Sequence, residues 1–352
     1  MTHLTIPLDP TIDFLIGLLN IPSPTGYHRE ANAYTRAAFE ALNIPDLHIH
    51  ETGKGALMLT WCGETSDKAR GVTAHLDTLG LMVREIKANG RLKTSPIGGI
   101  SYNSVESEGV TVRTFADTRF RGTAQMVNPS LHVNANLRTS ERSAENIEIR
   151  LDAKTSSAAD TRALGIDVGD FIFVDPRVEV TDTGFIKSRF LDDKAGVANI
   201  YGAIMALRDA GVRPAWDTEF LIANYEEVGH GGSSGWTRAL TELLSIDMGA
   251  LGESQNSDEF SVSICIKDAS GPYHFDLTHK LRNLALQHAI PHKPDIYVFY
   301  SSDGSAYWRA GGDAQVALIG PGVEASHAYE RTHRESILNT THLLAQYLLS
   351  DS

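Results

Sequence analysis

The sequence predicts an α/β fold in which a mixed sheet between helices is interrupted by an inserted β-barrel-like domain. At both ends of the 352-residue chain, stretches with helical spacing of apolar residues alternate with short apolar runs typical of strands. From about Gly90 to Val180 the helical spacing fades, and strand-like runs are separated by Gly, Asn, Asp and Ser. We therefore place an α/β domain at residues 1–83 and 183–352 and a β-rich insertion at 84–182, since insertions are tolerated where chain ends lie close together.

The first part of the α/β domain alternates helices with strands. Its first helix is stopped by the Pro- and Gly-rich stretch Ile21–Gly26, and its last strand runs into His75 and Asp77. The expected helices are Thr11–Leu19 and Arg29–Leu42, and the expected strands are His48–Ile49, Gly55–Trp61 and Lys68–His75.

The inserted domain is expected to be mainly strand. Its exposed strand edges would need to be covered, so we expect it to mediate assembly with other subunits rather than chemistry. The expected strands are Val110–Phe115, Arg121–Val127, Ile147–Leu151 and Phe171–Val174, with one helix at Ser157–Leu164.

The α/β pattern returns after Ile186. A turn and helix are expected at Asp192–Ala210, and a closing helix is expected at Glu335–Leu349. The expected strands between them are Trp216–Asn224, Leu243–Ile246 and Val316–Ile319.

Composition and charge narrow the function. With 31 basic and 44 acidic residues the net charge is −13, which argues against nucleic acid and anionic membranes as partners. Cys62 and Cys265 lie far apart and are expected to be reduced thiols. No stretch approaches the roughly 18 apolar residues of a membrane span, and the first ten residues lack the features of a signal peptide, so a cytoplasmic location is expected.

Side chains that bind metals or move protons follow several of the expected strands. Each pattern has a plain structural interpretation, since Asp192 and Asp193 could cap the following helix and the short His75-x-Asp77 pattern could lie in a surface loop. Together they favour a site, because ligands collect beyond the carboxyl ends of strands in open α/β sheets. The residues concerned are His75, Asp192, Glu226 or Glu227, Asp247 and His327.

This set of donors suits two divalent ions about 3.5–4 Å apart that share one carboxylate. No thiolate takes part, so zinc, cobalt and manganese are all chemically suitable. Asp77 could accept the second ring N–H of His75 and orient it. Glu226 and Glu227 would face opposite ways in a strand-like segment, so one could bind metal while the other faces the substrate.

In this order, the motifs resemble those of the dinuclear metallo-aminopeptidases related to glutamyl aminopeptidase and the tetrahedral aminopeptidases, peptidase family forty-two. The resemblance covers nearly the whole chain, and it includes the opening stretch Leu19–Gly26, the insertion, and Ser302-Asp303-Gly304, which resembles the family's Thr-Asp segment before the last strand. It implies a zinc-peptidase fold of the phosphorylase/hydrolase type. The motifs that carry it are His75-x-Asp77, Asp192-Asp193-Lys-Ala-Gly, Glu226-Glu227, Asp247 and His327.

The resemblance implies a role for each residue. Asp192 would bridge the metals, with His75 and Asp247 completing one site and Glu227 and His327 completing the other. Glu226 would be the general base, and Asp77 would orient His75. Asp193 would support the site or cap the helix.

Two departures from the family pattern concern single positions. The family has Glu-Ile after His-x-Asp, where this chain has Thr78-Leu79, so the shape of the pocket can differ. His327 and His333 compete as the last ligand, and we choose His327 because it lies nearer the end of the preceding strand.

The implied activity is that of an aminopeptidase that uses two divalent ions per subunit, zinc or cobalt first and manganese third, on small peptides or peptide-like amides. The implied assembly is a homo-oligomer, dimer-based and up to a dodecamer. A narrower resemblance is to the subgroup linked to the osmoprotectant N-acetylglutaminylglutamine amide. It rests on Asp170–Pro176, Ser188–Val197, Gln255–Gly271 and Ser326–His333.

Three alternatives remain at the level of sequence. A related dinuclear carboxypeptidase or N-acyl amidohydrolase would not need a free N-terminal amine on its substrate. A non-catalytic scaffold on a hydrolase fold would have no reason to keep the base Glu226. A glycosidase with paired carboxylates would not need the His ligands.

Overall fold

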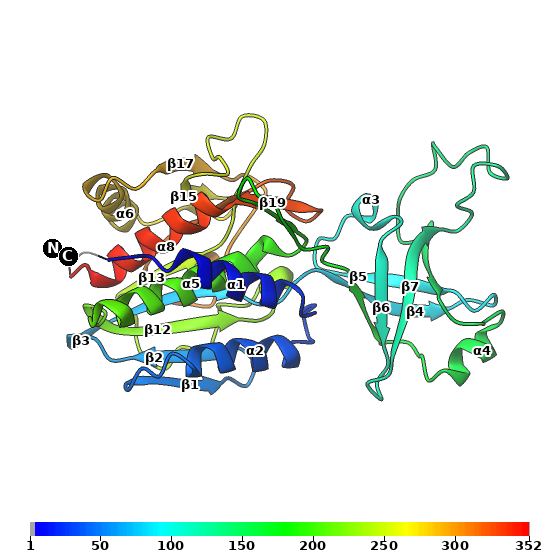
Figure 1. Ribbon diagram of the computed structural model, residues 1–352, viewed down its shortest axis with the longest axis horizontal. Coiled ribbons are helices and arrows are strands. Elements are labelled where there is room, and N and C mark those ends of the chain that lie inside the picture. The colour runs from blue at the N-terminus through cyan, green and yellow to red at the C-terminus, as the bar shows by residue number, and fades with distance from the viewer. Residues whose placement is uncertain (1–3, 352) are drawn as a thin grey trace. The chain divides into compact units, whose positions relative to one another are not determined.

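The computed structural model of the protein describes residues 4–351 (Figure 1). Met1–His3, which belong to the first ten residues in which no signal peptide is expected, lie outside the described residues. The described chain forms two compact units. One comprises the residues up to Asp77 and those from Val178 on, and the other comprises Thr78–Arg177. The boundaries between the two units were expected at 83/84 and 182/183. None of the helices in the described chain has the length and apolar character needed to cross a membrane.

The larger unit is built on a mixed sheet of ten described strands. Its path runs β1-β2-β12-β3-β13-β18-β15-β16, with β14 paired to β18 and β17 paired to β15. Strands β3, β12, β13 and β18 are parallel, so their carboxyl ends meet at one edge of the sheet. The strands are β1 (Leu47–Glu51), β2 (Leu57–Trp61), β3 (Thr65–His75), β12 (Trp216–Ala223), β13 (Glu242–Ile246), β14 (Gly249–Ala250), β15 (Val262–Asp268), β16 (Gly271–Pro272), β17 (His292–Ile296) and β18 (Gln315–Val323).

Helix α5 (Leu191–Ala210) lies at the centre of this unit. It is apolar around most of its circumference and buried along most of its length, as expected for a helix that packs between other elements. It contacts α1 (Leu8–Leu19) and α8 (Arg334–Leu349), and these three helices run side by side in Figure 1. Gly202 of α5 allows the close approach of α1, because a Cβ at this position would lie 2.5 Å from Thr11 Oγ1. The other helices of the unit are α2 (Arg29–Glu40), α6 (Phe275–Gln287) and α7 (Asp303–Arg309).

A small antiparallel sheet joins two segments that are far apart in the sequence. It consists of β10 (Glu179–Val180), β11 (Phe185–Ser188) and β19 (Glu330–His333), in the order β10-β11-β19. Ser188 pairs with Glu330, so the turn that follows β11 lies beside the loop that precedes β19. This pairing brings the region of Asp192 to the region of His327.

The smaller unit is a closed barrel in the order β4-β5-β8-β7-β6-β9, with two short helices. Its interior is filled by alternating apolar side chains such as Val110 and Val112. Closure leaves no unpaired edge along the barrel, so the expectation that its strand edges need a partner does not hold. The elements are β4 (Gly80–Ile86), β5 (Leu92–Ile97), α3 (Tyr102–Val105), β6 (Gly109–Arg113), β7 (Arg119–Met126), β8 (Ile147–Leu151), α4 (Ala158–Ala163) and β9 (Phe171–Val174).

Candidate metal centre

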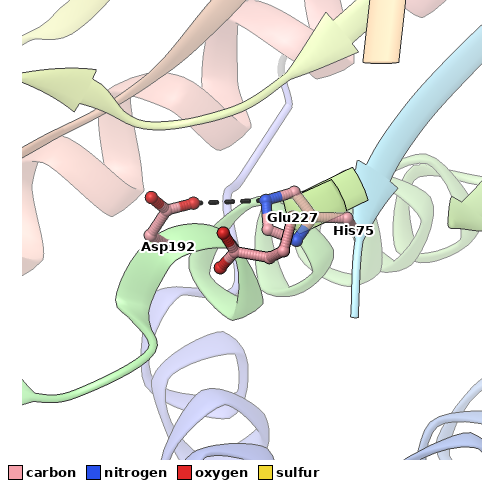
Figure 2. Close-up of side chains that lie close together, drawn as sticks. All are labelled: His75, Asp192 and Glu227. Atoms are coloured by element: carbon pink, nitrogen blue, oxygen red, sulfur yellow. Dashed lines mark hydrogen bonds and ion pairs between the residues drawn. The ribbon is translucent and has the colours of Figure 1, made fainter. Parts of the chain in front are cut away.

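The residues singled out in the sequence gather at the carboxyl edge of the parallel strands. His75 ends β3, Asp247 follows β13, and Glu226 and Glu227 follow β12. Figure 2 shows His75, Asp192 and Glu227 with their side chains close together. A pocket of about 510 Å³ opens beside them and is lined by Asp192, Glu226, Glu227, Asp247 and His327 among others.

Asp192 lies between the two histidines. Its Oδ1 is 3.2 Å from Nε2 of His75, the contact drawn as a dashed line in Figure 2, and its Oδ2 is 3.6 Å from Nε2 of His327. Oδ2 also accepts a hydrogen bond from the hydroxyl of Ser326 at 3.0 Å. The two oxygen atoms of one carboxylate therefore face two different imidazoles.

Two groups of potential ligand atoms share His75. In each group one donor atom from every residue lies within 4.8 Å of the others. The first group is His75, Asp192 and Glu227, and the second is His75, Asp193 and Asp247. Asp193 also accepts backbone hydrogen bonds from His75 at 3.2 Å and from Gly196 at 3.1 Å, which ties it to the start of α5.

Glu226 and Glu227 do not lie on an extended segment, and the prediction of one was wrong. They begin a 3₁₀ turn, η1 (Glu226–Val228), because Tyr225 adopts a left-handed conformation with φ 72° directly after β12. The two side chains still diverge. Glu226 Oε2 is 3.6 Å from Nε2 of His75, and Glu227 Oε2 is 3.6 Å from Nε2 of His327.

Asp77 holds the turn of the two glutamates. Its Oδ1 accepts from the backbone N–H of Glu226 at 3.1 Å, and its Oδ2 accepts from that of Glu227 at 3.3 Å. Nδ1 of His75 lies 2.9 Å from the backbone carbonyl oxygen of Asp77, whereas the carboxylate is 3.8 Å away. The Asp77 carboxylate was expected to accept the second ring N–H of His75. The backbone carbonyl of Asp77 is the group that contacts this ring nitrogen, because the carboxylate already accepts from two backbone amides.

The opening motif of the chain supports Asp77 from the other side. The hydroxyl of Thr25 donates to Oδ2 of Asp77 at 2.6 Å, and the hydroxyl of Ser23 donates to the carbonyl of Leu76 at 2.8 Å. Both hydroxyl-bearing residues are buried. The Pro- and Gly-rich stretch after α1 thus fixes the end of β3, which carries His75.

The backbone is strained at three places next to the acids and imidazoles. Phe190, Tyr225 and His327 have φ values of 72°, 72° and 66°. Residues with a Cβ rarely adopt this left-handed region, and they do so mainly where the surrounding structure requires it. The peptide bond between Asp192 and Asp193 is cis.

His333 lies apart from this cluster. It is the N-cap of α8 and its Nδ1 accepts from the backbone N–H of Glu335 at 3.2 Å, while Nε2 lies 3.0 Å from the carbonyl of Thr183. His327, by contrast, contacts Asp192 and Glu227.

Burial governs the titration of the cluster. It raises the pKa of the carboxyl groups of Glu226, Glu227 and Asp247 well above their usual values, and repulsion from neighbouring acids adds to this effect while the charge of His75 opposes it. Asp192 differs. Burial favours its neutral form, but its hydrogen bond with His75 and the charges of His75 and His327 lower its pKa. For His75 itself, burial opposes the charge, and the carboxylates of Glu226 and Asp192 raise the pKa well above its usual value.

The donor set fits divalent cations. Oε1 of Glu227 is a buried carboxylate oxygen with no hydrogen-bond partner, which is costly unless a cation binds it. Among the described residues, no Lys or Arg forms an ion pair with Asp192, Glu226, Glu227 or Asp247. Carboxylate oxygens and imidazole nitrogens are the ligands that zinc, cobalt and manganese accept. The residues present therefore match a metal centre.

Two further acids, neither of them among the predicted site residues, are buried beside the site. Glu330 accepts from the backbone N–H of Asp192 and from that of His327, both at 3.1 Å. Asp303 accepts from the backbone N–H of Gly232 at 2.6 Å, in the loop after the two glutamates. Burial raises the pKa of Asp303 to about 6. Asp303 belongs to Ser302-Asp303-Gly304, which resembles the family pattern but was given no role, whereas Glu330 is brought to Asp192 by the register of β11 with β19.

A mixed α/β sheet with buried acids and imidazoles at its carboxyl edge defines the class of metallohydrolases. The chain belongs to the M42 glutamyl aminopeptidase family, whose model matches residues 55–343, and it is therefore a peptidase. It is 46% identical over 340 residues to the Bacillus subtilis (strain 168) protein named "Putative aminopeptidase YhfE", with 97% of each chain covered.

Solved structures agree in fold. The TET aminopeptidase of the marine sediment archaeon Thaumarchaeota archaeon SCGC AB-539-E09 has a TM-score of 0.87 at 18% identity, covering 98% of this chain and 97% of that one. The TET1 peptidase of Pyrococcus horikoshii, described as assembling into a tetrahedron or a large octahedral shell, has a TM-score of 0.82 at 20% identity, covering 97% and 99%. At these identities the likeness shows the fold alone.

Proposed function

We propose that the protein is an aminopeptidase that depends on two divalent metal ions. The observation that supports this most directly is the position of Asp192, whose two oxygen atoms face different histidines. Asp192 would be shared by both ions. His75 and Asp247 would complete one site, and Glu227 and His327 would complete the other. Zinc or cobalt fits this donor set best, and manganese also suits it.

When bound, the ions act as Lewis acids on the peptide carbonyl and lower the pKa of water. The chain supplies the proton transfers. Glu226 would accept a proton from the attacking water and return it to the leaving amine, as a general base and acid. Asp77 would keep Glu226 and Glu227 in place through their backbone amides.

The activity is tested by digesting pairs of peptides that differ only in a free or acetylated N-terminus, with mass spectrometry as readout. We expect the metal-loaded enzyme to release the first residue of the free peptides only. Equal cleavage of the acetylated peptides would indicate an N-acyl amidohydrolase, and release of the last residue would indicate a carboxypeptidase. Elemental analysis of the same sample should find up to two divalent ions per chain.

A finer proposal concerns the osmoprotectant. The resemblance of Ser188–Val197 and Gln255–Gly271 to the subgroup linked to N-acetylglutaminylglutamine amide supports a role in its metabolism. The acetylated compound has no free amine, so the enzyme would act on glutaminylglutamine amide after deacetylation. The enzyme is incubated with each of the two compounds, and we expect it to cleave glutaminylglutamine amide and not the acetylated compound. If it cleaves neither compound, the proposed role in osmoprotectant metabolism is wrong.

We also propose that the chain forms a homo-oligomer through its barrel unit. Several large apolar side chains of this unit are exposed, including Phe115 at 96% and Val133 at 74%. Exposed apolar surface of this kind is typical of a contact between proteins. Light scattering should find an assembly larger than a monomer at micromolar concentration, and the double change Phe115→Ser and Val133→Ser should shift it toward smaller species.

A further inference from the structure

The pocket beside the metal centre has two chemically different sides. Its charged and ionisable lining consists of the cluster already described, namely Asp192, Glu226, Glu227, Asp247 and His327. The rest of its wall carries no Lys, Arg, Asp or Glu side chain. It combines apolar and aromatic side chains with a few neutral polar ones. The apolar and aromatic residues are Met248, Ala250, Tyr297, Val298, Phe299 and Tyr300, and the others are Gly229, Gln255, Ser301 and Ser326.

Part of this wall consists of apolar side chains that lie open to solvent. Val298 is 56% exposed and Phe299 is 99% exposed, although both line the pocket. Covering such side chains with an apolar group is favourable, because it removes apolar surface from water. A ligand held at the metal centre would lie next to them.

The amide nitrogen of Gln255, which also lines the pocket, already has partners within the chain. Its side-chain N–H₂ donates to Oδ1 of Asp295 at 3.2 Å and to the carbonyl of Ile296 at 2.8 Å. The wall therefore offers no free cation to an acidic side chain. It also offers no carboxylate to a basic side chain apart from those assigned to the metals.

We infer that this wall binds the side chain of the substrate's N-terminal residue and selects a neutral, preferably apolar one. The inference rests on the proposed function and adds the substrate class to it. A glutamyl side chain, which the name of the family suggests, would meet no Lys or Arg on this wall. A lysyl side chain would lose hydration and would meet no carboxylate apart from those assigned to the metals.

The test is binding, measured by calorimetry on the metal-loaded Glu226→Gln variant, which should not turn the ligands over. Two pairs of amino-acid amides isolate the effect of charge. Glutaminamide and glutamic acid α-amide have the same size, and norleucinamide and lysinamide have nearly the same length. We expect the neutral member of each pair to bind at least about tenfold more tightly, and norleucinamide to bind best.

Equal or tighter binding of the charged member in either pair would overturn the inference, as would the absence of binding by all four amides. The proposed function is tested separately by turnover of the same residues as N-terminal amides with wild-type enzyme. If the neutral amides bind selectively but no peptide is cleaved, the proposed function fails while the selectivity of the wall stands.

The wall itself is tested with Phe299→Ala and a matched control. Ile296 is an apolar residue on the same segment, 47% exposed, but it does not line the pocket. We expect Phe299→Ala to weaken binding of norleucinamide about tenfold and to leave that of alaninamide unchanged, since alanine is too short to cover Phe299. Ile296→Ala should change neither.

Two results would contradict the assignment of Phe299. One is unchanged binding of norleucinamide, and the other is an equal loss for alaninamide, which would indicate a general disturbance of the site. If light scattering shows that Phe299→Ala alters the assembly while binding is retained, Phe299 belongs to a subunit contact and not to the pocket wall.

Discussion

Strand β13 carries a buried acid at each end, and the two acids have opposite surroundings. Glu242 begins the strand and forms ion pairs with Arg70 at 3.2 Å and with Lys280 at 3.0 Å. Arg70 is fully buried between the rings of Trp216 and Tyr347. Asp247 follows the other end of the strand and, within the described chain, has no basic side chain as a partner, only a neighbouring backbone N–H at 2.8 Å.

The difference separates two uses of a buried carboxylate. A buried charge is tolerated when it is paired, and the chain pairs Glu242 with its own cations. At the carboxyl edge of the same sheet the acids have no Lys or Arg partner among the described residues. Asp192, Glu226 and Glu227 contact only the imidazoles of His75 and His327 as basic groups. The first arrangement stabilises the fold, whereas the second leaves room for cations that come from outside the chain.

The strongest test of this contrast is Asp192→Ala. Because Asp192 faces both His75 and His327, we expect the loss of both ions and of activity. Elemental analysis after dialysis provides the measurement, with Asp209→Ala, an exposed acid at the end of the same helix, as control. Retention of two ions by Asp192→Ala would disprove the shared role.

Glu226→Gln and Glu227→Gln should affect different properties of the enzyme, the first its turnover and the second its metal binding. Glu226→Gln keeps size and polarity but cannot accept the proton, so turnover should fall by roughly 10²–10⁴-fold while metal stays bound. Glu227→Gln should weaken the metal site that includes His327. Metal content and kcat measured on both variants decide the matter, and an exchange of the two phenotypes would exchange the roles.

Glu330→Gln should have a smaller effect on the metals. The carboxylate holds the backbones of Asp192 and His327, so an amide in its place should misplace both ligands. Outer groups of this kind change metal affinity by roughly 10–100-fold. Competition with a chelator of known affinity measures this, and an unchanged affinity would show that Glu330 supports only the fold.

Glu242→Gln should leave metal and activity unchanged and reduce stability. It removes the charge that compensates the buried Arg70, at a cost of about 3 kcal/mol in the free energy of unfolding. The midpoint of denaturant unfolding gives the readout, with kcat and metal content as internal controls. A loss of metal in this variant would contradict the view that Glu242 stabilises the fold and that only the acids at the other end of β13 bind metal.

Several strand ends and the donors that follow them could be predicted from the sequence. β3 ends at His75 and β13 at Ile246 as expected, whereas β18 continues beyond Ile319 to Val323. Apolar runs located β9, β12 and β13, and the alternation of apolar with charged residues located β8 of the barrel.

The expected strands did not include β4 or β5. β5 contains Lys93, Ser95 and Pro96 and becomes a strand because barrel closure supplies partners on both sides, whereas β4 is largely apolar. β15 and β17 were not predicted either. β15 pairs with the adjacent β16, with β17 and with β18.

The contacts among the proposed metal-ligating side chains depend on the tertiary structure. His75 and Asp192 are separated by more than a hundred residues, and their contact depends on parallel pairing in the large sheet and on the end of β11. The 3₁₀ turn of Glu226, the use of the Asp77 carboxylate on two backbone amides, and the clamp of Glu330 are likewise set by contacts between distant segments. Local propensity does not encode such contacts, because their free energy comes from burial and hydrogen bonds that exist only once the strands are side by side.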